Sequence, residues 1–419
     1  MKKLRFFYPI FILMAVFLFP VLGNSVTETS SPLTSVRGNA CIIKDHIVYE
    51  LIEREYPQKA YYNVCAFFDS QEAFETTREI RIASEIDGTP VRKIETQYKY
   101  EFGGEFEYRA LFPLSQDIST EKAKVYDLGE NTTLKRIVLP NGIKKIGVAT
   151  FRNLKALEEI RLPQSLVSIG NDAFSNCIAL QKIDLPSSLK KLGGGSFAGT
   201  GLTELELPAG IKAIPANLCA DCIALKKVSL SNRTESIGLY AFFNTNLTSI
   251  QLPDSLKAIN GYAFKNTALK SIKIPENCEL YAGVFRDCKN LKKVVFAKRS
   301  GLILLRSDLF YSCSNLKKIK MYSNTSLEIA ATTLRKCTSL QSFTIPRYAK
   351  MLNGPVFADC IQLKKLRILP TNTELLTNNG LFLQTIPDTC RIYVKTAAMK
   401  RAVVGAGFTG KVIVKADLK

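Results

Sequence analysis

The chain has 419 residues, 46% of them hydrophobic, and 57 Lys and Arg against 37 Asp and Glu give a formal net charge of +20. It contains one histidine, His46, and no tryptophan, so it offers little for acid–base catalysis or metal binding. The composition therefore argues against an enzyme, and the charge favours anionic partners.

The first residues predict a secretory signal peptide over residues 1–23. Met1 to Arg5 is basic, Phe6 to Phe19 is almost entirely apolar, and small residues lead up to Gly23. A membrane anchor is the alternative, but the apolar run is shorter than the roughly 20 residues that a spanning helix needs. No later stretch could span a membrane. We therefore expect an exported chain with no membrane span after cleavage.

Residues 24–75 do not fit the repeat described below and predict an N-terminal cap. The segments 49–54 and 60–68 read as paired strands, which are needed because the first coil of a repeat array would otherwise expose its apolar face. Cys41 and Cys65 both lie here. A disulfide between them would stiffen this end, but the sequence leaves open whether they are bridged.

A repeat array is predicted over residues 76–385, with an insertion at about 95–133. The first, degenerate repeat contains Ile80 to Ile82 and Val91 to Ile94, and the insertion interrupts the period directly afterwards. The insertion carries a run of aromatic residues: Tyr98, Tyr100, Phe102, Phe106 and Tyr108. It is either a binding loop or an extension of the cap that folds its aromatic side chains onto the first coils.

The regular array begins at Leu134, where the pattern Leu-x-x-Ile-x-Leu starts to return every 22 to 25 residues as far as Leu363. This spacing is typical of leucine-rich repeats. Most copies continue with a turn and a second short apolar pair. Five of them then have a phenylalanine, followed three residues later by a Cys or Thr in all but the first: Phe151, Phe174, Phe197, Phe242 and Phe264. Three alternating apolar positions cannot bury their inner face alone, so the copies are expected to stack as parallel strands about 4.8 Å apart.

The phenylalanines predict a buried spine, and the Cys or Thr slot predicts a small inward-facing position. Cys219 and Cys222 form a Cys-x-x-Cys pair, but they fall in the phenylalanine slot and the Cys slot of the repeat. A buried core pair is therefore expected in place of a redox or zinc site. The ladder cysteines are expected to be free thiols.

The segment from Leu157 to Cys177 resembles the BspA-like class of bacterial leucine-rich repeat over its whole length, and the resemblance covers roughly residues 76 to 394. The expected fold is a leucine-rich repeat solenoid of α/β type, a right-handed superhelix. It has a parallel concave β-sheet, short second strands and helical or 3₁₀ turns on its outer side. The resemblance implies an exported bacterial protein used for surface binding and adhesion.

Residues 386–419 predict a C-terminal cap. A strand ends at Val394, a helical segment covers residues 395–404, and a last strand covers residues 411–415.

The candidate binding site lies on the strand positions that face outward between the apolar ones. These positions are mixed or acidic in early copies, as at Glu159, Glu204 and Glu206, and become basic in the later ones. The predicted basic strip consists of Lys293, Lys318, Lys320, Lys365 and Arg367. It would bind a protein or an anionic polysaccharide, and not nucleic acid. The alternative is a solvated face that keeps the sheet from pairing with other chains. The aromatic insertion is the secondary candidate.

The sequence thus predicts an exported non-enzymatic binding protein, a cell-surface adhesin or capture module, without catalytic residues, metal or cofactor. The alternative is a periplasmic or envelope scaffold that binds another bacterial component. The expected location is the cell surface, the extracellular space or the periplasm.

Overall fold

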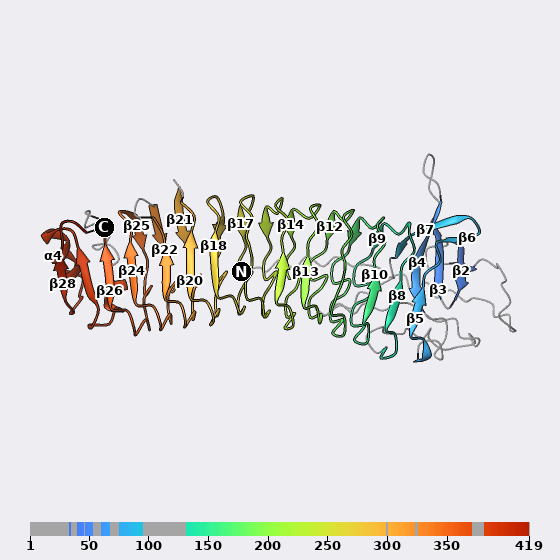
Figure 1. The fold of residues 1–419 in the computed structure, drawn as a ribbon, viewed down its shortest axis with the longest axis horizontal. Helices are drawn as coiled ribbons and strands as arrows, with labels where there is room; N and C mark the ends of the chain where they lie inside the picture. Colours follow the sequence, from blue (N-terminus) through green and yellow to red (C-terminus); the bar gives the residue numbers. More distant parts are fainter. Residues whose placement is uncertain are drawn as a thin grey trace, which may run out of the picture.

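The computed structural model describes residues 33–34, 40–45, 47–52, 60–67, 75–94, 131–298, 301–322, 326–370 and 381–418. The predicted signal peptide and the five aromatic residues of the insertion lie outside these ranges. Figure 1 shows the coils stacked in a nearly straight row, with the N-terminal strands at one end and α4 at the other.

Most coils contribute one strand to each of two parallel faces, although the Leu180 and Leu247 copies form no first strand, so that the first face consists of several short sheets, which are treated together below. The Leu-x-x-Ile-x-Leu segments pair in register with their neighbours and form the first-strand sheet, which was predicted to be the concave one. Its strands are β5 (Glu79–Arg81), β8 (Arg136–Val138), β10 (Glu159–Arg161), β13 (Glu204–Glu206), β15 (Lys227–Ser229), β18 (Ser271–Ile274), β20 (Lys293–Phe296), β22 (Lys318–Lys320), β24 (Ser342–Ile345), β26 (Lys365–Ile368), β27 (Arg391–Val394) and β28 (Val412–Val414).

The second apolar pair of each copy forms a shorter strand, and these strands build the second-strand sheet. Its strands are β7 (Thr89–Ile94), β9 (Lys145–Ile146), β11 (Ser168–Ile169), β12 (Lys191–Leu192), β14 (Ala213–Ile214), β16 (Ser236–Ile237), β17 (Ala258–Ile259), β19 (Glu279–Leu280), β21 (Leu302–Leu305), β23 (Ser326–Ile329) and β25 (Tyr348–Leu352). The predicted parallel solenoid is confirmed, and its right-handed sense stays a prediction.

The core between the two sheets contains the predicted phenylalanine spine. Phe151, Phe174 and Phe197 stack with ring centroids 5.4 and 5.8 Å apart. A second stack runs from Phe242 to Phe310 with spacings of 5.5 to 5.7 Å. Buried Cys219 takes the spine position between the two stacks. Stacked aromatic rings bury large apolar areas and add a specific ring–ring attraction, so the spine fixes the register of successive coils.

The outer side of the array differs from the prediction of helical or 3₁₀ turns. Within the described part of residues 131–370, the chain between one second strand and the next first strand forms hydrogen-bonded turns and no helix. Asp172 and Asn176 have φ values of 53° and 61°, and the equivalent residues of most coils are also left-handed. Each left-handed residue prevents a helix from continuing. Asn, Asp and Gly dominate these positions because they tolerate this conformation best.

The N-terminal end contains four strands: β1 (Leu33–Thr34), β2 (Ala40–Lys44), β3 (Ile47–Ile52) and β4 (Tyr61–Phe67). They pair in antiparallel order, and β4 then pairs in parallel with β7, which attaches them to the second-strand sheet. The predicted pairing of 49–54 with 60–68 is confirmed. Because β3 lies between β2 and β4, two strand spacings of ~4.8 Å separate Cys41 from Cys65. The side chains of these two cysteines lie outside the described part of the structure, so whether they are bridged stays open.

The stacking continues across the insertion. β8 pairs directly with β5, and β9 pairs with β7. β6 (Glu85–Ile86) forms a small antiparallel hairpin with β7. The coil before the insertion therefore belongs to the same array as the coil after it.

At the C-terminal end, the short helix α3 (Leu381–Gln384) is followed by β27, α4 (Ala397–Gly405) and β28. The Thr396 hydroxyl accepts a hydrogen bond from the Met399 amide at 3.1 Å and caps α4. The predicted order of strand, helix and strand is confirmed, and both strands extend the first-strand sheet. No helix in the described residues is both long and apolar enough to cross a membrane.

Candidate binding surface

The three exposed lysines of the predicted basic strip lie together on β20 and β22, two neighbouring strands. Their parallel register places Lys293 beside Lys318, and Val295 beside Lys320. All three side chains are exposed because they alternate with the apolar residues that enter the core. The strands lie in the orange part of the array in Figure 1.

Cations on adjacent strands repel each other, so this arrangement costs stability. Like charges directly opposite each other on a sheet are destabilising. In the described part of the chain, no ion pair involves Lys293, Lys318 or Lys320. The charge of these lysines is therefore available to a ligand.

The early coils carry charges at the same positions but pair them with each other. Glu159 accepts from Arg161 at 2.7 Å and contacts Arg136 on the neighbouring strand at 3.0 Å. The hydrogen bond from Arg161 is the main cause that lowers the pKa of Glu159. Lys227 lies 3.9 Å from Glu204. The early part of the sheet thus presents opposite charges side by side, whereas the later part presents cations.

The structure does not bring all five predicted residues into one row. Lys365 and Arg367 lie on β26, and β24 with Ser342 and Thr344 lies between them and the three lysines. Both are half-buried, and the Lys365 Nζ lies 4.8 Å from the Tyr393 ring centroid, a cation–π contact. The strip therefore consists of an exposed lysine group and a separate, less exposed pair.

A second row of cations was missed. The residue after the first leucine of each repeat precedes the strand and is also exposed, and in three of the four late copies it is a lysine, as it is in some earlier copies. These additional residues are Lys292, Lys317 and Lys364. They were overlooked because only positions between the apolar strand residues were considered. Together with Lys293 and Lys318, they turn the strip into a two-dimensional basic patch.

The cysteine ladder belongs to the core and not to a site. The thiols of Cys177, Cys222, Cys288, Cys313 and Cys337 each donate to the carbonyl of the spine residue one coil earlier, at 2.9 to 3.2 Å. These side chains are buried and free. Burial raises the pKa of Cys288 to about 11.

The Cys-x-x-Cys pair lies where the repeat pattern places it. Cys219 and Cys222 are both fully buried, and Cys222 shares a 3.2 Å hydrogen bond with the Thr200 hydroxyl. Burial raises the pKa of the Cys219 thiol well above its usual value. No cluster of three potential metal ligands occurs among the residues that the structure describes.

Comparison with family models gives one match, described as BspA type Leucine rich repeat region (6 copies), over residues 128–233, 212–326 and 279–384. These overlapping ranges cover more than half of the chain. A search of curated proteins finds no match.

Among solved structures, a leucine-rich repeat protein from Bacteroides ovatus is 20% identical, with a TM-score of 0.50 over 89% of this chain and 99% of that chain. A leucine rich cell surface protein from Faecalibacterium prausnitzii is 16% identical, with a TM-score of 0.48 over 87% of this chain and 97% of its own. The pneumococcal vaccine antigen PcpA is 17% identical, with a TM-score of 0.47 over 92% and 100% of the two chains. At 20% identity, the likeness to the Bacteroides ovatus protein supports the fold alone.

Proposed function

Because the chain belongs to the BspA-type leucine-rich repeat family, we propose that it is an exported, non-enzymatic binding protein whose basic strip holds an anionic partner. The observation that carries the proposal is the register of Lys293 beside Lys318. A face that served only solubility would not need cations on directly adjacent strands, since mixed charges keep a sheet soluble without the repulsion.

An anionic polysaccharide fits this surface better than a protein. Lysine is depleted in the centres of protein–protein interfaces, which usually contain aromatic or apolar anchors. Here the centre consists of exposed lysines, with the next row formed by Lys292 and Lys317. Parallel strands about 4.8 Å apart present these charges at intervals along the array, which suits a polymer with repeated anionic groups.

The cell surface is the location that agrees best with this activity, because an exported repeat array could present the strip to host or neighbouring glycans. We propose an adhesin or capture role on this basis. The alternative role, an envelope scaffold, would use the same strip to hold an anionic polymer of the bacterial envelope.

Charge reversal tests the proposal. The triple variant Lys318→Glu, Lys320→Glu and Lys365→Glu should lose binding to immobilised heparin, measured by surface plasmon resonance. The double variant Glu204→Lys and Glu206→Lys should bind at least as well as the unmodified protein. Binding should also weaken strongly between 0.1 M and 1 M salt, because the Debye length falls from about 10 Å to about 3 Å.

A matched control separates local from overall charge. Lys144, Lys190 and Lys212 are exposed and precede second strands, so their replacement by glutamate changes the net charge equally on the other sheet. This control should retain binding. Equal losses of heparin binding in both triple variants would contradict the proposed site. Binding to polyglutamate but not to heparin would contradict the proposed polysaccharide partner.

A further inference from the structure

Tyr322 lies at one end of the exposed lysine group, two residues after the end of β22. Lys318, Lys320 and Tyr322 are exposed, whereas Ile319 and Met321 between them are half-buried and pack against the core. This alternation continues the pattern of the strand, so Tyr322 lies on the same outward face as the two lysines. Successive outward residues of a strand are about 6.7 Å apart, which places the tyrosine beside Lys320.

The repeat does not require an aromatic residue at this position. In seven other copies the residue six positions after the first leucine is a proline, which ends the strand. Tyr322 takes this place in the Leu316 copy, and it is 42% exposed. A proline would end the strand equally well, so stacking of the coils does not explain the ring.

The ring of Tyr322 is open, whereas every other tyrosine of residues 131–418 has a ring contact. Tyr240 and Tyr262 stack on each other with their centroids 5.1 Å apart. The remaining tyrosines each lie under an arginine or lysine at 4.5 to 5.9 Å from the ring centroid: Tyr281, Tyr311, Tyr348 and Tyr393. Tyr322 has no stacking or cation–π contact with another described residue. Its ring is therefore available to a ligand that lies on the lysine group.

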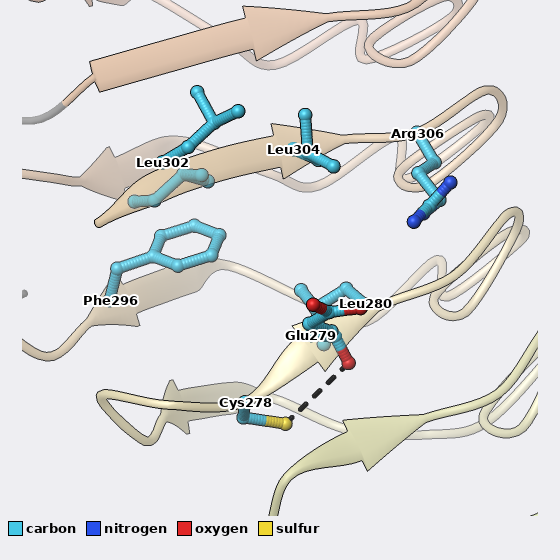
Figure 2. Close-up of a pocket in the computed structure, with 8 residues that line it drawn as sticks. Cys278, Glu279, Leu280, Phe296, Leu302, Leu304 and Arg306 are labelled. Carbon is cyan, nitrogen blue, oxygen red and sulfur yellow. Dashed lines mark hydrogen bonds between the residues drawn. The ribbon is translucent and has the colours of Figure 1, made fainter.

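The neighbouring strand presents no second aromatic ring on this face. Phe296 of β20 is buried, and Figure 2 shows its side chain directed toward Leu302, at one end of the cavity between β19 and β21. The outward residue of β20 beside Lys320 is Val295, which is half-buried and short. Among the described residues of these two strands and the segments that follow them, Tyr322 is therefore the aromatic ring on the face with the lysines.

We propose that Tyr322 makes the basic strip selective for a polysaccharide, because it stacks on one sugar ring while Lys318 and Lys320 bind the acidic groups of the polymer. This inference rests on the proposed function of the strip. A sugar ring has an apolar face of C–H groups that can pack on an aromatic ring, and the tyrosine hydroxyl stays in water. A protein partner would need such anchors at the centre of the surface, and Tyr322 lies at its edge.

The tyrosine separates ligands that carry similar charge. A linear polyanion without sugar rings, such as inorganic polyphosphate, satisfies the lysines but has no group that stacks on Tyr322. Tyr322→Ala should therefore weaken heparin binding about five- to tenfold in surface plasmon resonance, because the stacking contact is lost. Polyphosphate binding should stay unchanged in this variant. Tyr322→Phe keeps the ring and should keep the affinity for heparin.

Two further measurements guard against other causes. Tyr322→Pro introduces the residue of seven other copies, so it should fold, and it should lose heparin affinity as the alanine variant does. The slope of log affinity against log salt should stay unchanged in both variants, since no charge is removed, whereas Lys320→Ala should lower this slope. Tyr348→Ala, at an exposed tyrosine of the other sheet, should leave heparin binding unchanged. Unchanged melting temperatures would show that each variant folds.

The inference is overturned if Tyr322→Ala and Tyr322→Pro bind heparin like the unmodified protein, or if they lose polyphosphate binding to the same extent as heparin binding. A phenylalanine variant as weak as the alanine variant would also overturn it, since the ring would then not be the binding group. These outcomes leave the basic strip itself intact if the lysine variants still lose binding. Absence of heparin binding by the unmodified protein would instead refute the proposed function, and this inference with it.

Discussion

The position three residues after each spine residue can be either cysteine or threonine, because both side chains donate a hydrogen bond to the carbonyl of a spine residue. Cys288 reaches the Phe264 carbonyl of the preceding coil at 3.0 Å, and Thr267 reaches the same carbonyl from its own coil at 3.0 Å. The slot was recognised from the sequence as small and inward-facing. Its hydrogen bonds were not, because the pattern does not tell which carbonyl lies within reach of a side chain in a neighbouring coil.

Because the thiols are buried, the stability of the folded protein should fall at alkaline pH. The folded protein holds the Cys288 proton up to a pKa of about 11, while the ordinary thiol pKa is 9.0. The raised pKa means that the thiol's contribution is complete below pH 9 and is lost as the pH rises toward 11. Between these values the free energy of unfolding should fall by about 1.4 kcal/mol per pH unit for this thiol alone.

The variant Cys288→Thr tests this prediction, because threonine occupies the slot in other coils and does not titrate. Urea denaturation at pH 8 and pH 10 should show a smaller loss of stability in the variant than in the unmodified protein. Equal losses would mean that lysine and tyrosine titration, and not the buried thiol, determines the alkaline instability.

At the scale of the elements, the two strands of each coil and the phenylalanine spine could be predicted because each repeat shows the same apolar spacing. The turns could not be predicted in the same way. Asn176, Asn244 and Asn266 are visible in the sequence, but their role depends on backbone geometry: all three are left-handed.

The asparagines of the outer turns should be important for stability. Asn266 has a φ of 56°, and its amide donates to the Asn244 side chain at 2.7 Å. Asn266→Ala should lower the free energy of unfolding by about 1 to 2 kcal/mol, because alanine is strained in the left-handed region.

Two further variants identify the cause. Asn266→Gly keeps the conformation accessible and should be less destabilising than alanine, and Asn290→Ala, at an exposed residue, should be nearly neutral. These effects are measured by urea denaturation. A glycine variant as unstable as the alanine variant would assign the effect to the lost amide hydrogen bond and not to backbone strain.

At the scale of the whole molecule, the two sheets have different properties. The first-strand sheet changes along the array from paired charges to unpaired cations, and this change was predictable because it is written in the outward positions of each copy. The split of the strip by β24 is visible in the same outward positions, Ser342 and Thr344, but it was overlooked because only the charged copies were considered. A rigid stack of coils keeps both groups at a fixed separation, so a long polymer can contact both whereas a short oligosaccharide cannot.

The insertion offers the last test at this scale. In the coil that follows it, 12 residues (147–158) connect the second strand β9 to the next first strand β10, whereas 41 residues (95–135) connect β7 to β8. Because β8 already pairs with β5 and β9 with β7, the longer connection is not needed for stacking. Replacing residues 95–130 by a copy of residues 147–153 should therefore give a regular coil. The free energy of unfolding in urea should be unchanged or higher.

The same variant decides between the two candidate binding sites. It removes Tyr98, Tyr100, Phe102, Phe106 and Tyr108 and leaves the basic strip intact. If the strip binds the polysaccharide, the variant should bind heparin with the affinity and salt dependence of the unmodified protein. If binding is lost while the stability is retained, the aromatic insertion is the binding site, and the lysines on β20 and β22 are a solvated face. A loss of both stability and binding would instead assign the insertion to the N-terminal cap, which packs its aromatic side chains on the first coils.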